Sequence, residues 1–178
     1  MKTSWATYAG LAARRHAISP DGGRMAIATG GFFQVMEKGE GAGMTGWKLH
    51  VSVAPKDVGA AWDVLYPFLE ERGIALAKVA MPDTARKLGN PNHPQAGKMI
   101  TVYADETPRP WAEIAACMEG ILHDAGIRPG PEVAGEAKLF ASRYTTFRND
   151  LDAAGRYVKA EAKAIEKYEP SPFCGRRS

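Results

Sequence analysis

Apolar and polar side chains alternate along Trp47–Val53. Successive side chains of a β-strand point to opposite faces, so this pattern predicts a strand whose apolar face covers a core. The polar face then carries three groups in one row, which a strand holds more rigidly than a loop would. These groups belong to Lys48, His50 and Ser52. An ordinary amphipathic strand with a solvated face has the same pattern, so this stretch alone does not distinguish a site from a surface.

Four further segments predict strands. Ile74–Met81 is apolar except for Lys78, a lone charge that either reaches the surface or has a task in a pocket. Lys98–Tyr103 is a second clear strand. Arg24–Met36 fits a strand pair, or one strand broken at its two glycines, and Lys138–Phe147 fits a final strand or extended segment.

Helical periodicity marks two long segments. Pro55 begins a helix that ends at Gly73, and a second helix over residues 110–125 is capped by Gly126. Shorter or more polar helices are predicted at residues 5–15 and from Arg148 to about Tyr168, and residues 83–88 fit a short polar helix or a turn. This order of elements favours an α+β fold, a single domain in which helices pack on a largely antiparallel sheet.

The length of the chain limits how this fold is organised. With 178 residues, of which 45% are hydrophobic, the chain suffices for one domain with a core but not for two. We expect an N-terminal segment with a flexible glycine-rich loop over residues 1–45, the α+β domain over residues 46–168 and a frayed tail over residues 169–178. The loop, which contains four glycines between residues 38 and 46, is placed to act as a lid or as a plain linker.

Charge, cysteines and hydropathy narrow the class of protein. A net charge of +3 without a polybasic run does not indicate nucleic acid as a partner, and it fits a positive cleft for a phosphate. Cys117 and Cys174 lie far apart without a metal-binding spacing, so we expect neither a disulfide framework nor a metal site. No apolar run reaches transmembrane length, and residues 1–19 do not resemble a secretory signal peptide. We therefore expect a cytoplasmic protein without a membrane partner.

The predicted strands and their flanks gather cationic and titratable side chains. These are Lys48, His50, Lys78, Lys98, Tyr103, Arg143 and Arg148. The set lacks a serine or cysteine nucleophile with its base, and it suits a dianionic ligand such as a phosphate ester. A lysine crowded by other cations has a lowered pKa and can act as a general base, while a histidine near a phosphate can act as a general acid. Such a pair fits the β-elimination of phosphate from a phosphoserine or phosphothreonine residue.

Four motifs, in this order along the chain, resemble one family of enzymes. They are Lys48-Leu-His50-Val-Ser52-Val, then Lys78 in the next strand, then Gly97-Lys-Met-Ile-Thr-Val-Tyr103, then Arg143-Tyr144-Thr-Thr-Phe147. They are similar to elements of the type III effector phosphothreonine lyases and of the lyase domains at the N-terminus of class III and IV lanthipeptide synthetases. Arg148-Asn-Asp also resembles a Tyr-Arg-Asn-Glu element of the effectors. The resemblance spans about residues 46–150 and implies a phosphothreonine or phosphoserine lyase.

The resemblance also implies roles for individual residues. Lys78 would be the base and His50 the acid of an elimination that needs no metal and no cofactor and yields dehydroalanine or dehydrobutyrine. Lys48 would contact the phosphate, and Tyr103 would pack or hydrogen-bond beside it. The other predicted phosphate ligands are Arg148, Arg143, Lys98 and Arg86.

Two features depart from the family. The effectors have an arginine about ten residues before the tyrosine, where this chain has His93, so Arg86, Lys87 or Lys98 are candidates to replace it. The synthetases carry a kinase behind the lyase domain and this sequence shows none. We therefore expect a separate kinase to phosphorylate the peptide or protein substrate.

Several functions are compatible with this sequence. The Arg-Tyr-x-x-Phe element favours a role in lanthipeptide-type maturation, and the alternative within the family is a type III effector, secreted into a host, that inactivates a host phospho-kinase. A phosphopeptide-binding module without catalysis would keep the arginines but need neither Lys78 nor His50. A two-histidine phosphoesterase would need a second His-x-Ser/Thr motif, which the other histidines do not supply. A structural or nucleic-acid-binding domain is the remaining alternative.

Overall fold

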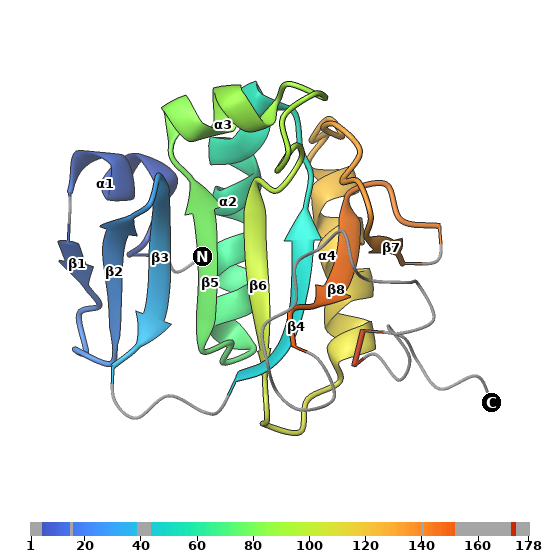
Figure 1. The fold of residues 1–178 in the computed structure, drawn as a ribbon. Coiled ribbons are helices and arrows are strands. Elements are labelled where there is room, and N and C mark those ends of the chain that lie inside the picture. Colours follow the sequence, from blue (N-terminus) through green and yellow to red (C-terminus); the bar gives the residue numbers. More distant parts are fainter. Residues whose placement is uncertain (1–4, 15, 39–43, 140, 152–171, 174–178) are drawn as a thin grey trace.

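The computed structural model describes residues 5–14, 16–38, 44–139, 141–151 and 172–173. Within these residues the strands form one eight-stranded sheet in the order β1-β2-β3-β5-β6-β4-β8-β7, and all neighbouring pairs are antiparallel (Figure 1). The strands are β1 (His16–Ile18), β2 (Arg24–Thr29), β3 (Phe32–Glu37), β4 (Met44–Val51), β5 (Leu76–Ala80), β6 (Ile100–Asp105), β7 (Ala137–Lys138) and β8 (Thr145–Asn149). The helices are α1 (Tyr8–Ala13), the 3-10 helix η1 (Pro55–Asp57), α2 (Val58–Glu71), α3 (Pro82–Leu88) and α4 (Trp111–Asp124). The prediction of a single α+β domain with helices on an antiparallel sheet is confirmed.

The core lies between the sheet and the helices α2 and α4, which cover one of its faces (Figure 1). Trp62 of α2 and Met118 of α4 are fully buried, as are Leu49 and Val51 of β4. Burying a side chain of this size contributes roughly 1.5–3 kcal/mol. A shift of β4 by one residue would exchange its faces and expose these side chains. The apolar parity of β4 therefore fixes its polar row on the face away from α2 and α4.

The helices α2 and α4 both end just before the glycines at which the sequence analysis predicted their ends. Gly73 has a φ of 67°, and Ile74 N–H donates to the carbonyl of Leu69 at 3.0 Å, as in a Schellman motif. Gly126 has the same φ of 67°, and Ile127 N–H donates to the carbonyl of Leu122 at 3.1 Å. The positive φ explains why glycine stands at each position, because a side chain would strain the backbone there.

The N-terminal region contributes more to the sheet than the sequence indicated. The predicted strand pair is the hairpin β2–β3, and β1 extends it at the edge of the sheet. β3 pairs with β5, so residues within 1–45 belong to the same sheet as the later strands. β4 begins at Met44, which shortens the predicted glycine-rich loop, and residues 39–43 lie outside the described part of the chain. The predicted division of the chain into residues 1–45, 46–168 and 169–178 otherwise remains a prediction.

The C-terminal strand differs from its prediction in its bounds. The segment predicted over residues 138–147 consists of the two-residue β7 and the separate strand β8. β8 continues to Asn149, so no helix begins at Arg148, which instead pairs with β4 as a strand residue. The remainder of the predicted helix and most of the predicted tail lie outside the described residues.

Glu119 of α4 fixes the bend through which the chain enters β8. Its carboxylate accepts backbone N–H groups from Arg143 at 3.0 Å, Tyr144 at 3.1 Å and Thr145 at 2.9 Å. Tyr144 is buried and donates its hydroxyl to the carbonyl of Ile127 at 2.7 Å. The Arg-Tyr-x-x-Phe element therefore has a structural role here, since it anchors the strand that carries Arg148.

We expect Glu119→Gln to lower the free energy of unfolding by about 1–3 kcal/mol at neutral pH, because the amide accepts these hydrogen bonds less strongly than the carboxylate. Burial opposes ionisation of Glu119, but hydrogen bonds from Ser142, Thr145 and the bend lower its pKa below 4.5. A lowered folded-state pKa gives stability above pH 4.5 that is lost as pH falls through the lowered value. Urea unfolding at several pH values should show the two proteins converging in acid. Glu113→Gln, on an exposed position of the same helix, is the control and should change little.

Candidate active site

Three neighbouring strands place the predicted base and acid on one face of the sheet. Residues opposite each other in an antiparallel ladder point to the same face. His50 of β4 lies opposite Thr101 of β6, and Thr101 lies opposite Lys78 of β5. Lys78 and His50 therefore stand on either side of Thr101, with Cα atoms about 10 Å apart. A substrate residue bound over Thr101 would have one of them on each side.

Lys48 is the centre of a second cross-strand set, one step along the same face. It lies opposite Tyr103 of β6 and Arg148 of β8, and its Nζ is 5.1 Å from the centroid of the Tyr103 ring. Its ammonium group also pairs with Asp150, whose side chain is buried. Arg148 Nε lies 2.7 Å from Oδ1 of the same carboxylate. Asp150 thus holds two of the predicted phosphate ligands side by side.

The ring of His50 is buried and held by Glu136. Nδ1 of His50 lies 2.9 Å from Oε2 of Glu136, whose side chain is only 1% exposed. A carboxylate only accepts hydrogen bonds, so Nδ1 carries a proton and donates it to Glu136. Nε2 is therefore the nitrogen that can face a ligand. Burial lowers the pKa of His50 below its ordinary value, against the opposing effect of Glu136, which favours the neutral ring in the free protein.

Glu136 stays ionised because donors and cations surround it. Lys98 Nζ lies 3.3 Å from Oε1, and the hydroxyl of Thr146 donates to Oε2 at 2.8 Å. Burial alone would raise the pKa of Glu136, but the hydrogen bond from His50 and the groups of Lys98 and Thr146 lower it to about 2. An anionic Glu136 fixes the orientation of the imidazole, and it would stabilise the imidazolium once the ring gains a second proton.

Lys78 is the cation of this face best suited to lose its proton. Burial lowers its pKa below 10.5, and the charge of Lys48 lowers it further, while Asp150 opposes the shift. Nζ lies 4.3 Å from the centroid of the Phe32 ring and 6.0 Å from that of Tyr103, so the amine stands between two aromatic rings. Burial also lowers the pKa of Lys98, but the ion pair of Lys98 with Glu136 favours its charged form.

The side chains on this face have an excess of positive charge. Its two buried carboxylates face four cationic residues, which are Lys48, Lys78, Lys98 and Arg148. An excess of positive charge around a partly buried site favours a dianionic ligand such as a phosphate ester. We use the name strand row for these four cationic residues together with His50, Thr101 and Tyr103.

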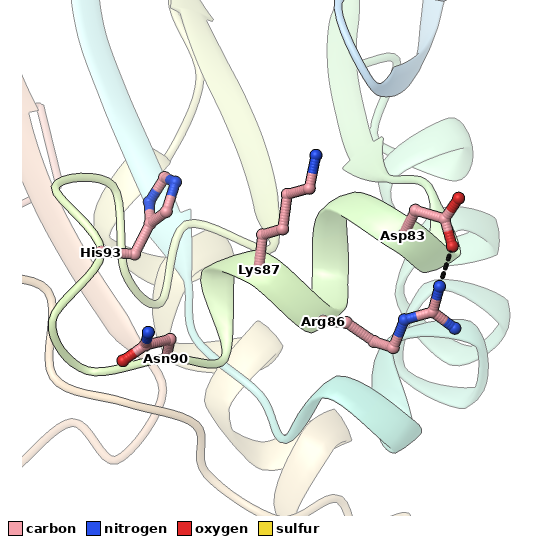
Figure 2. Close-up of a pocket in the computed structure, with 5 residues that line it drawn as sticks. All are labelled: Asp83, Arg86, Lys87, Asn90 and His93. Carbon is pink, nitrogen blue, oxygen red and sulfur yellow. Dashed lines mark hydrogen bonds and ion pairs between the residues drawn. The ribbon is translucent and has the colours of Figure 1, made fainter.

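Two of the predicted phosphate ligands lie elsewhere. Arg143 is exposed in the bend before β8, where its backbone is held by Glu119 of α4. Arg86 is exposed on α3 and pairs with Asp83, as Figure 2 shows. Within the described part of the chain, neither guanidinium group contacts a residue of the strand row. The phosphate-binding roles of Arg143 and Arg86 stay predictions.

The sequence analysis missed Glu136, Asp150 and Phe32. Asp150 could have been found, because it follows Arg148 by two residues and so continues the same face of the strand. Phe32 lies on the same face of the sheet as Lys78, because Gln34, two residues further along β3, lies opposite Lys78. This register between β3 and β5 could not be read from the sequence. Glu136 gave no signal, since it precedes a two-residue strand in a loop without periodicity.

The described residues contain no group of three or more His, Cys, Asp or Glu side chains that could hold a metal ion. None of the helices in the described part of the chain is long and apolar enough to cross a membrane.

Comparisons with known proteins identify a family and a shared fold. The profile of the family described as "RamC, N-terminal domain" matches residues 13–169. No curated protein sequence matches the chain.

Solved structures of phosphothreonine lyases share the fold. SpvC, an effector protein from Salmonella, superposes with a TM-score of 0.67 at 20% identity, over 83% of this chain and 77% of that chain. OspF, a type III effector from Shigella flexneri, gives 0.65 at 20% identity, over 84% and 80%. VirA, an effector from Chromobacterium violaceum, gives 0.66 at 21% identity, over 88% and 77%. The resemblance to phosphothreonine lyases is thus confirmed at the level of the fold.

Proposed function

The chain belongs to the RamC N-terminal domain family, and on that premise we propose that it is a phosphoserine or phosphothreonine lyase. It would remove phosphate from a phosphorylated peptide or protein by β-elimination and leave dehydroalanine or dehydrobutyrine. The observation that carries the proposal is the placement of Lys78 and His50 on one face, on either side of Thr101. The shared fold of the phosphothreonine lyases supports it.

The elimination needs a base on one side of the substrate and an acid on the other. Neutral Lys78 takes the proton from Cα of the phosphorylated residue, and the electron pair of that C–H bond forms the Cα=Cβ double bond. The Cβ–O bond breaks, and Nε2–H of protonated His50 gives its proton to the departing phosphate oxygen. Lys78 ends protonated and His50 neutral, so both exchange one proton with solvent before the next turnover.

The phosphate both binds to the site and prepares the acid. Lys48 and Arg148 are held together by Asp150 before the substrate arrives, which limits the cost of ordering them. A phosphate dianion beside His50 would raise the pKa of the imidazole, which burial lowers in the free protein. The acid would therefore form mainly in the complex, with the new proton on Nε2 and with Glu136 still accepting the Nδ1–H.

Two kinds of substrate fit this chemistry equally well. The Arg143-Tyr144-x-x-Phe147 element favours a peptide in lanthipeptide-type maturation. The shared fold with effectors named phosphothreonine lyases favours a phosphorylated host protein. An unfolded phosphopeptide and a folded phosphoprotein of the same local sequence would distinguish them, because a maturation enzyme should prefer the flexible peptide.

The direct test is the mass of the product. Incubation with a phosphothreonine peptide should give a peptide lighter by one phosphoric acid, which gains the mass of an added thiol because dehydroamino acids accept nucleophiles. The reaction should persist with a chelator, because Lys48, Lys98 and Arg148 supply the positive charge at the phosphate.

A phosphatase would release a peptide heavier than the elimination product by one water, and it would not react with the thiol. That product would exclude the lyase. Tight binding without any product would instead favour the phosphopeptide-binding module, which has the same cations but no need of Lys78.

A further inference from the structure

We propose that Thr101 is a further catalytic residue of the elimination, whose hydroxyl donates a hydrogen bond to the carbonyl oxygen of the phosphorylated residue while the Cα proton is removed. This inference rests on the proposed lyase function and adds a role that the base, the acid and the phosphate ligands do not fill. Thr101 would stabilise the negative charge that develops on that oxygen in the transition state.

Thr101 lies at the centre of the strand row, on the interior strand β6. It stands opposite Lys78 of β5 on one side and opposite His50 of β4 on the other. A substrate residue with its Cα near Lys78 and its phosphate near His50 therefore lies over Thr101. The carbonyl group attached to that Cα can then turn toward the sheet and meet the hydroxyl of Thr101.

The hydroxyl of Thr101 is buried without a hydrogen-bond partner among the described residues. A buried hydroxyl that makes no hydrogen bond destabilises the folded protein, and each such group in a native protein calls for an explanation. Valine has nearly the same shape and would avoid this cost. The unpaired hydroxyl is therefore expected to serve the reaction and not the fold.

A second threonine beside His50 provides the contrast. His50 lies between Thr101 of β6 and Thr146 of β8 in the ladder. The hydroxyl of Thr146 donates to Glu136 at 2.8 Å, so it helps to hold the carboxylate that orients the imidazole. Thr101 makes no such contact within the described part of the chain, and its hydroxyl remains available to the substrate.

Burial does not separate Thr101 from the substrate. Thr101 is 1% exposed, and the side chains of His50 and Arg148 are only 5% and 7% exposed. A substrate that reaches the imidazole must part the side chains that cover this face, and it thereby uncovers Thr101 as well. Because Thr101 is β-branched, its χ1 angle is restricted and its hydroxyl is held in place before the substrate arrives.

The elimination creates a negative charge for which no donor has yet been assigned. When Lys78 takes the Cα proton, the electron pair of the C–H bond moves in part onto the neighbouring carbonyl oxygen, and it then forms the Cα=Cβ bond as the Cβ–O bond breaks. His50 and the phosphate ligands act at the other end of the substrate residue. Tyr103 lies opposite Lys48, one step along the row, and not between the base and the acid. Thr101 is therefore the donor placed for the carbonyl oxygen.

The test compares Thr101→Val, which removes the hydroxyl, with Thr101→Ser, which keeps it. For a phosphothreonine peptide we expect Thr101→Val to lower kcat by about 10²-fold, while Kd for a phosphonate analogue that cannot eliminate changes by about twofold or less. Thr101→Ser should keep kcat within about fivefold. Deuterium at Cα should slow Thr101→Val more than the unaltered protein, because proton removal then limits the rate more strongly.

Stability separates this role from a structural one. Thr101→Val removes an unpaired buried hydroxyl, so the thermal midpoint of the free protein should rise by about 2–4 °C while activity falls. Thr145→Val is the matched control, because Thr145 is equally buried but donates its hydroxyl to Glu119 at 2.7 Å. That variant should lower the midpoint and change kcat by about twofold or less. A purely structural residue would lose activity together with stability.

The leaving group provides a further check. The charge on the carbonyl oxygen develops whichever group departs, so Thr101→Val should slow a sulfothreonine peptide as much as the phosphothreonine peptide. A loss confined to the phosphothreonine peptide would assign Thr101 to the positioning of His50 and would refute the hydrogen bond to the carbonyl.

The outcomes separate this inference from the proposed function. An unchanged kcat in Thr101→Val would overturn the role of Thr101 and leave the lyase intact. Weaker binding with an unchanged kcat would do the same, because the hydroxyl would then hold the phosphate. If the unaltered protein eliminates phosphate from no peptide, the lyase proposal itself fails, and the role of Thr101 fails with it.

Discussion

Replacing Lys78 by methionine is expected to lower kcat for a phosphopeptide by about 10²- to 10⁴-fold while Kd changes by about threefold or less. Methionine keeps the length of the side chain and its contact with Phe32, so the substitution removes little besides the basic nitrogen. Binding should persist because Lys48 and Arg148 are the proposed ligands of the phosphate. Single-turnover rates measure the first quantity and peptide titration the second.

The matched control is Lys38→Met, which makes the same change at an exposed position at the end of β3. It should alter neither rate nor binding. A comparable loss of rate and binding in Lys78→Met would assign Lys78 to holding the phosphate and would leave the enzyme without an identified base.

The pH dependence of kcat provides an independent signature of the same residue. Only neutral Lys78 can accept the Cα proton, so the rate should fall as pH falls through its pKa in the complex. Burial and the neighbouring charge of Lys48 place this pKa below 10.5 in the free protein. The bound phosphate would raise it again, which limits the shift. The residual rate of Lys78→Met should lack this limb of the profile.

The strands that carry the strand row could be predicted because each has a pattern that burial enforces. In β4, Leu49 and Val51 are fully buried and so fix which face of the strand covers the core. Lys48 and His50 alternate with them and therefore lie on the other face. The lone charge of Lys78 in an apolar strand was a second local signal. Their alignment across three strands, however, came from the resemblance to a family, because strand order cannot be read from periodicity.

The carboxylates of the site could not be predicted in the same way. Glu136 reaches His50 across 86 positions of the chain, from a loop without a repeating pattern. Asp150 fell within the helix predicted from Arg148 onward, whereas β8 continues to Asn149. Without these two residues the cluster is a set of repelling cations, and the orientation of the imidazole is undefined.

The two arginines that the sequence analysis grouped as phosphate ligands lie in different surroundings. Arg143 and Arg148 are five residues apart, yet one lies in a bend held by α4 and the other in the strand opposite Lys48. The Tyr144 and Phe147 side chains of the intervening motif are buried in the core. A motif can therefore identify a family through its packing while the proposed phosphate ligand, Arg148, stands next to it.

Replacing His50 by asparagine is expected to lower kcat for a phosphothreonine peptide by about 10²- to 10⁴-fold, because it removes the proton donor for the leaving group. Asparagine can still donate its amide N–H to Glu136, so the buried carboxylate keeps a partner and the fold should tolerate the change. Thermal unfolding of the variant checks this.

A sulfothreonine peptide separates loss of the acid from general damage to the site. Sulfate is stable as a dianion and needs no proton on departure, so the variant should eliminate sulfate at nearly the rate of the unaltered protein. An equal loss with both leaving groups would contradict the role of His50 as the acid.

Glu136→Gln tests how the acid is held, with a readout that a merely structural residue would not alter. In the unaltered protein, nitrogen NMR should find His50 neutral at pH 7 with its proton on Nδ1, and it should find the ring protonated when a non-reactive phosphopeptide analogue is bound. Glutamine can accept the Nδ1–H without charge, so the variant should bind the analogue but leave the ring neutral, and kcat should fall toward that of His50→Asn. A His50 already protonated at neutral pH without ligand would refute formation of the acid by the substrate phosphate, because burial would then not have lowered the pKa of the imidazole.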